Sequence, residues 1–185
     1  MNRESFRFLA VLVCGLCVAG GCSTRPAALS NGHRTFGMEE ALNAIRNDID
    51  ARYGFRNGAP RINLGPCGRF ARDFRECWNA RFRDPVTIAF IMANNDASNC
   101  FHVLVRLPDG RYYDGGNGVM TAAFLVTLYP EGHIEEMKNF DFALLDKRSY
   151  GLGRTYPDCP NYSDEFTREV IEKRLSGLAA NGSHQ

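Results

Sequence analysis

A short turn between two apolar segments does most to restrict how this chain can fold. Residues 100–107 alternate between apolar and other side chains, which predicts a β-strand with one strongly apolar face. Residues 107–111 then read Leu-Pro-Asp-Gly-Arg, with proline at the second position and glycine where a left-handed conformation is required. This pattern favours a three-residue hairpin loop. The chain is therefore expected to return antiparallel to the strand it has just left.

The length of this loop decides which side chains meet across the hairpin. With three residues in the loop, Leu104 faces Asp114 on the returning strand. His102 then lies diagonal to Asp114 on the same face of the sheet, within side-chain reach. A two-residue Asp-Gly turn would shift the register by one and place the two side chains on opposite faces. The pairing of this histidine with this acid therefore depends on the type of turn.

Other elements are predicted from apolar spacing and from turn residues. The predicted helices are 38–53, 66–82 and 163–180, the predicted strands are 86–93, 100–107, 124–129 and 133–138, and loops fall at 54–65, 94–99 and 130–132. Residues 142–145 fit either a strand or a short helix. Together these elements predict one α+β domain over residues 35–180, followed by a tail at 181–185.

The N-terminal region has the features of an export signal. Basic residues precede an apolar run at 8–19, which is too short to span a bilayer and ends in Gly20-Gly21-Cys22-Ser23. Small residues directly before a cysteine resemble the lipobox of bacterial lipoproteins. This resemblance implies a signal peptide at 1–21, acylation of Cys22 and, from the following serine, an outer-membrane location facing the periplasm. Plain secretion and a misplaced start site are the alternatives. Residues 22–34 are expected to form a flexible tether.

Charge and cysteine content restrict the class of protein further. The chain has 22 basic and 21 acidic residues, so it lacks the basic excess typical of nucleic-acid binding. An oxidising compartment favours disulfides, and the four cysteines that remain after the leader and the acylated Cys22 allow three complete pairings. A bond between Cys67 and Cys77 is excluded, because one helix would hold them about 15 Å apart. We expect a Cys100–Cys159 disulfide, a buried Cys77 and a free Cys67. No metal-ligand spacing is found and no cofactor is implied.

One cysteine lies where a nucleophile would be expected. Cys67 begins the predicted helix 66–82, in the sequence Gly-Pro-Cys-Gly, and a helix N-terminus beside an imidazole stabilises a thiolate. In chain order it is followed by His102 as candidate base and Asp114 as candidate orienting acid. The Cys67 backbone N–H is a natural oxyanion donor, and the side chain of Asn63 is a candidate second donor.

The order of a helix-borne cysteine, a strand-borne histidine and an aspartate beside a hairpin is similar to that of the papain superfamily, in its transglutaminase-like and cell-wall endopeptidase branches. The resemblance covers about residues 64–118 and depends on Gly65-Pro66-Cys67-Gly68, on Phe101 to Val105 and on Tyr113-Asp114. It implies a nucleophile helix packed on an antiparallel sheet, without a cofactor. It also implies a thiol hydrolase or acyltransferase acting on peptide or isopeptide amides, with peptidoglycan as one candidate substrate.

Each of the three candidate residues also has a structural explanation. Cys67 could pair with another cysteine, His102 could be an interior histidine satisfied by backbone groups, and Asp114 could be a simple turn residue. The alternative function is therefore a non-catalytic envelope lipoprotein that keeps the same fold as a binding or scaffold module. Whether water or an amine accepts the acyl group, and the oligomeric state, stay open.

Overall fold

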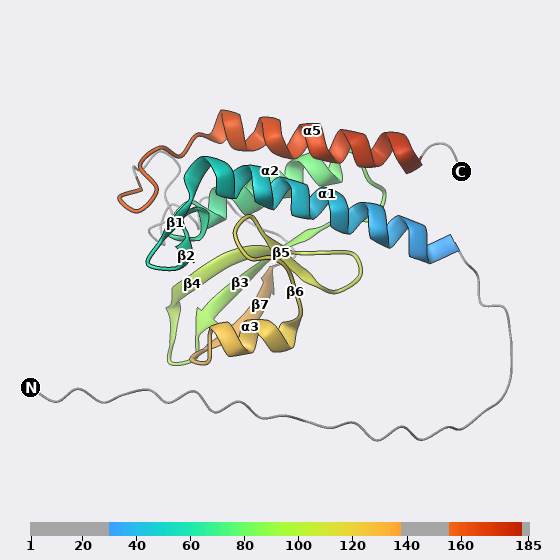
Figure 1. The fold of residues 1–185 in the computed structure, drawn as a ribbon. Helices are drawn as coiled ribbons and strands as arrows, with labels where there is room; N and C mark the ends of the chain where they lie inside the picture. The colour runs from blue at the N-terminus through green and yellow to red at the C-terminus, as the bar shows by residue number, and fades with distance from the viewer. Residues whose placement is uncertain (1–29, 138–155, 183–185) are drawn as a thin grey trace, which may run out of the picture.

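The computed structural model describes residues 30–137 and 156–182, which form an α+β fold (Figure 1). The described helices are α1 (Ser30–Tyr53), α2 (Cys67–Asn79), α3 (Ala122–Leu128) and α5 (Asp164–Gly182). A five-stranded antiparallel sheet has the order β6-β5-β4-β3-β7, made of β3 (Thr87–Ala93), β4 (Asp96–Arg106), β5 (Tyr112–Asp114), β6 (Gly118–Met120) and β7 (Gly132–Met137). A small hairpin, β1 (Phe55–Arg56) with β2 (Ala59–Pro60), and a 3-10 turn, η1 (Arg61–Asn63), connect α1 to α2.

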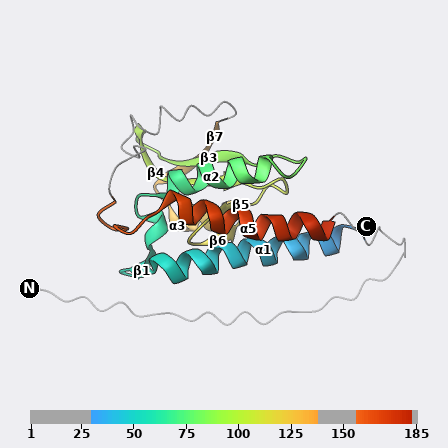
Figure 2. The ribbon, with the colours of Figure 1, turned by 90° about the horizontal axis from the view of Figure 1, so that it is seen from above.

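Helices cover both faces of the sheet, so its central strands are buried on both sides. Helices α1, α2 and α5 lie on one side and α3 lies on the other (Figures 1 and 2). The larger apolar cluster joins Phe90, Val103 and Val105 of the sheet to the three long helices. The smaller cluster joins the opposite side chains, including Leu104, to Leu125 of α3. The expected packing of the Cys67 helix on an antiparallel sheet is therefore present.

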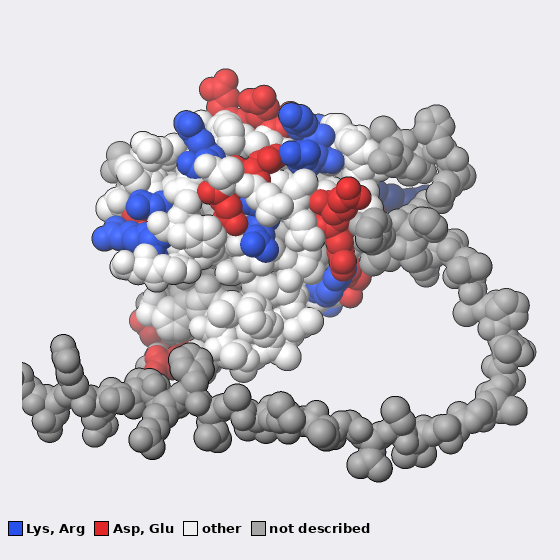
Figure 3. All heavy atoms as spheres, viewed as in Figure 1, with Lys and Arg blue, Asp and Glu red and all other residues white. Residues whose placement is uncertain are grey.

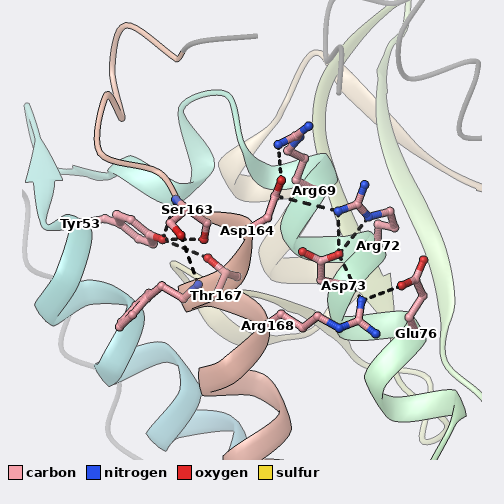
Figure 4. A network of polar contacts seen from close by, with 10 residues as sticks. Tyr53, Arg69, Arg72, Asp73, Glu76, Ser163, Asp164, Thr167 and Arg168 are labelled. Atoms are coloured by element: carbon pink, nitrogen blue, oxygen red, sulfur yellow. Dashed lines mark hydrogen bonds and ion pairs between the residues drawn. The ribbon is translucent and has the colours of Figure 1, made fainter. Parts of the chain in front are cut away.

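Ion pairs and hydrogen bonds connect α5 to α2, the helix that begins with Cys67 (Figure 4). Arg69 of α2 forms an ion pair with Asp164 at the start of α5. One turn further along, Arg168 Nη1 of α5 lies 2.9 Å from Glu76 Oε2 of α2. Buried Asp73 lies between the two helices, 2.8 Å from Arg72 Nη2. Because these contacts cross between helices far apart in the chain, they fix the position of α2 against the C-terminal helix.

The hairpin has the register predicted for a three-residue loop. The backbone N–H of Leu107 donates to the carbonyl of Arg111 at 2.7 Å, and Gly110 has φ of 86°. Val105 is paired with Tyr113, and continuing that register places Leu104 opposite Asp114. The prediction that His102 and Asp114 share one face of the sheet is therefore confirmed.

Several predicted boundaries and one predicted element are wrong. Helix α1 begins at Ser30, inside the expected tether, and β4 begins at Asp96, inside the expected loop 94–99. Residues 124–128 of the segment predicted as strand 124–129 are instead helical and form most of α3. Thr121 caps this helix, because its side chain accepts the backbone N–H of Phe124 at 3.2 Å. A short apolar run has no period that separates strand from helix, so the cap decides between them.

Several predictions concern residues at or beyond the limits of the described part of the chain. The expected signal peptide, the expected acylation site Cys22 and the undecided segment 142–145 lie outside the described residues. The expected tail at 181–185 is described only to Gly182, where α5 ends. None of the described helices has the length and apolar character needed to cross a bilayer.

Candidate active site

Cys67 is the first residue of α2, one residue after the predicted start of this helix. Pro66 occupies the cap position before it, and no side chain caps the helix start, so the first backbone N–H groups keep their partial positive charge there. The thiol is buried, with the residue only 2% exposed, and Sγ lies 3.9 Å from the carbonyl oxygen of Gly65. The nucleophile candidate therefore lies at the positive end of a helix, below the surface.

His102 and Asp114 are in direct contact inside the protein. His102 Nε2 lies 2.7 Å from Asp114 Oδ2, and both side chains are fully buried. Burial lowers the pKa of His102, but the hydrogen bond to Asp114 and the nearby thiol of Cys67 raise it, with a net pKa of about 10. His102 Nδ1 is buried without a hydrogen-bond partner among the described residues. With Nε2 held by the acid, Nδ1 is the nitrogen left for the neighbouring thiol.

The carboxylate of Asp114 is held by more donors than His102 alone. Oδ1 accepts the backbone N–H of Gly116 at 2.9 Å and of Asn117 at 2.5 Å. Oδ2 accepts the Asn117 side-chain amide at 3.0 Å. Burial raises the pKa of Asp114, yet these hydrogen bonds and the imidazole outweigh it and lower the pKa below 3.8. Asp114 is therefore an ionised, fixed acid rather than a simple turn residue.

Asn63 has a different position from the one expected of an oxyanion donor. Its side-chain Nδ2 lies 3.3 Å from both carboxylate oxygens of Asp114. The amide N–H groups are therefore directed at the acid in this structure, which corrects the expected role at the substrate carbonyl. Asn63 joins Asn117 in orienting Asp114, and the sequence pattern did not indicate either contact.

An aromatic ring that the sequence did not single out covers the histidine. Tyr129, which follows α3, lies 5.8 Å from the His102 ring between centroids, with 17° between their planes. Burial and the charge of Asp114 raise the pKa of Tyr129, so it stays neutral. The stacked ring limits the access of water to the His102–Asp114 hydrogen bond. Because residues 124–129 were expected to form a strand, this contact was not foreseen.

The expected Cys100–Cys159 disulfide is not formed. Cys67, Cys77 and Cys159 are free, buried thiols, while Cys100 Sγ lies 3.2 Å from the carbonyl oxygen of His102. Cys159 lies near Arg61. Among the described residues, moreover, no three His, Cys, Asp or Glu side chains are grouped to hold a metal ion. The side chains that meet at this site are a thiol, an imidazole and a carboxylate.

Gly65 is expected to be indispensable for the entry into α2. Its φ is 129°, and a Cβ there would lie 2.6 Å from Tyr156 Cδ1. Gly65→Ala should therefore lower the free energy of unfolding by about 2–5 kcal/mol, from backbone strain together with overpacking. Gly54→Ala is the matched control, because φ there is 69° and nothing lies within 4 Å of the added carbon, so it should cost only about 1–2 kcal/mol. Equal losses in urea unfolding would contradict the contact with Tyr156.

Comparison with known proteins finds no family model, no curated protein and no solved structure that matches this chain. Function is therefore inferred from the side chains of the site.

Proposed function

We propose that this protein is a thiol hydrolase or acyltransferase that acts on peptide or isopeptide amides through Cys67, His102 and Asp114. The observation that supports it most is the 2.7 Å contact between His102 Nε2 and Asp114 Oδ2, with the Cys67 thiol close enough to raise the pKa of the same imidazole. A structural histidine satisfied by backbone groups needs neither a carboxylate nor a thiol beside it. A catalytic base needs both, because the thiol is the nucleophile that it activates and the carboxylate orients its ring.

The reaction follows from these positions. The Cys67 thiolate attacks the amide carbonyl, a C–S bond forms, and the carbonyl oxygen takes up the negative charge beside the Cys67 backbone N–H. His102, protonated at neutral pH because of its raised pKa, gives its proton to the leaving nitrogen as the C–N bond breaks. Water or an amine then attacks the thioester carbon, forming a C–O or C–N bond, while His102 takes the proton of this second nucleophile; the C–S bond breaks and Cys67 is released as the thiolate. Asp114 holds the imidazole in one orientation throughout and stabilises its positive charge.

The proposed location follows from the leader. Acylation at Cys22 would tether the domain to the outer membrane on its periplasmic side, where the peptide stems of peptidoglycan supply both amide and isopeptide bonds. This location makes peptidoglycan peptides the first substrates to test.

One observation favours a second candidate function, a non-catalytic binding or scaffold lipoprotein. Cys67 is only 2% exposed, and a nucleophile must be reached by its substrate. A buried thiol that never becomes accessible would act only in packing. The two functions differ in the reactivity of Cys67 in the native protein.

Thiol mapping tests the proposal directly. The native protein is treated with iodoacetamide at neutral pH, and the modified cysteines are located by mass spectrometry. We expect Cys67 to react first, with Cys77 as the internal control, because burial raises the pKa of Cys77 to about 11. His102→Ala should slow the alkylation of Cys67, since the imidazolium that stabilises its thiolate is removed. A native Cys67 that reacts no faster than Cys77 would support the non-catalytic module instead.

The pH dependence of turnover should report the state of His102. Because the imidazolium supplies the proton to the leaving nitrogen, activity should fall as pH rises through about 10, the pKa of His102. Asp114→Asn removes the charge that raises this pKa, so the alkaline limb should move to lower pH. The measurement is a profile of kcat/KM between neutral pH and pH 11 for both proteins. If the alkaline limb does not move in Asp114→Asn, the group that titrates there is not the His102–Asp114 pair, and the prediction is wrong.

A further inference from the structure

Helix α3 exposes an unusual amount of apolar surface. Three of the five large apolar side chains that are exposed in the described part of the chain belong to this seven-residue helix: Phe124 at 48%, Val126 at 57% and Leu128 at 41%. Leu125 is the one residue of α3 that is buried in the smaller core cluster. Concentrated apolar exposure of this kind marks an interaction surface.

The segment around α3 also lacks charge. Residues 115–130 contain no Asp, Glu, Lys or Arg, and residues 112–137 contain no Lys or Arg. In Figure 3 the surface over α3, in the lower part of the molecule, is uncharged, with acidic side chains at its lower left edge and both acidic and basic side chains over the long helices above it. The patch over α3 is therefore uncharged, although the exposed Glu131, Glu135 and Glu136 follow it in the chain, and a partner recognised at this patch would be apolar rather than anionic.

The proposed tether is long enough for this surface to reach a membrane. Seven residues, 23–29, separate Cys22 from the start of α1 at Ser30, and even fully extended they reach about 25 Å. From Ser30 to Glu39 the helix rises about 14 Å. Glu39 and Asn43 line one cavity together with Thr121, the N-cap residue of α3. A lipid on Cys22 would therefore leave α3 able to reach the bilayer.

We propose that α3 is a membrane-docking helix, which seats Phe124, Val126 and Leu128 in the apolar part of the lipid interface. This inference depends on the acylation of Cys22 that forms part of the proposed function. A single short helix binds a bilayer weakly when free, but the tether keeps it at the surface at high effective concentration. Tyr129, stacked on His102, directly follows α3. Docking therefore places the active site next to the membrane and favours substrates attached at or near it.

The experiment places a reporter on α3 in the full mature chain, acylated and reconstituted in vesicles of phosphatidylcholine and phosphatidylethanolamine. Val126→Trp should show emission shifted to shorter wavelength and strong quenching when the lipids carry bromine on their acyl chains. Glu169→Trp, on the exposed side of α5, is the matched control and should show neither change. Trp78 is buried and common to all variants. Quenching should not fall with added salt, because the segment offers no basic residue to anionic lipids.

Two further measurements separate docking from anchoring. Adding Phe124→Ser and Leu128→Ser to the Val126→Trp chain should remove the quenching, while thermal unfolding shows that the fold is kept. Mass spectrometry of the N-terminal peptide reports acylation independently. If Cys22 is acylated but Val126→Trp is quenched no more than Glu169→Trp, the docking helix is refuted although the anchor stands. A blue-shifted but unquenched reporter would also refute it, since a protein surface, such as a second copy, then covers α3.

Discussion

Cys67→Ala is expected to lower the rate of amide cleavage roughly 10⁴–10⁶-fold, which is the size of loss seen when a nucleophile is removed from a triad. The reason is chemical, because no other group in the site can form the thioester. The measurement is product release by liquid chromatography and mass spectrometry, from a panel of peptide and isopeptide amides that includes peptidoglycan stem peptides. Substrate binding should change little, because the side chain lost is small.

The matched control for this variant is Cys77→Ala, in the same helix. The thiol of Cys77 is buried and lies 3.7 Å from Glu172 Oε1 of α5, so its removal changes packing near the other end of α2 without touching His102. Turnover should then stay close to that of the parent. A Cys67→Ala chain that keeps its activity, or a Cys77→Ala chain that loses it to the same extent, would exclude Cys67 as the nucleophile.

Local turn chemistry explains why much of the site could be predicted. Proline and glycine in residues 107–111 specify one loop length, and loop length specifies which side chains share a face. This relation predicts from the sequence alone that His102 and Asp114 lie side by side, as they do. Likewise, glycine and proline before Cys67 mark the start of a helix, and α2 begins at that residue.

What could not be predicted depends on contacts between distant segments. Asn63 reaches Asp114 across 51 residues of chain, and no local pattern encodes that meeting. The segment 124–129 is ambiguous by itself, since its apolar run suits a strand, and Thr121 outside the run makes it a helix. Tyr129 was missed for the same reason. The predicted Cys100–Cys159 disulfide is wrong because the number of cysteines does not tell which of them lie close together in space.

Asp114→Ala is expected to lower the free energy of unfolding by about 3–5 kcal/mol, in addition to a large loss of activity. The substitution leaves His102 buried without its partner, and an uncompensated buried charge costs about this much. It also leaves the backbone N–H groups of Gly116 and Asn117 without their acceptor. Urea unfolding at neutral pH measures the loss. Asp48→Ala is the control, because Asp48 pairs with Arg174 on the partly exposed surface and should cost no more than about 1 kcal/mol.

The pH dependence of this stability difference identifies its origin. The pKa of Asp114 is below 3.8 in the folded state, so its contribution is present above that pH and is lost as pH falls through the folded pKa. The pKa of His102 is raised from 6.5 to about 10, so its contribution is complete below pH 6.5 and is lost as pH rises through about 10. The gap between the parent and Asp114→Ala should therefore be widest from about pH 4 to 6.5 and narrow on both sides. A gap that is constant from pH 3 to 10 would mean that Asp114 stabilises the fold by packing alone, and the charged pair on which catalysis depends would be absent.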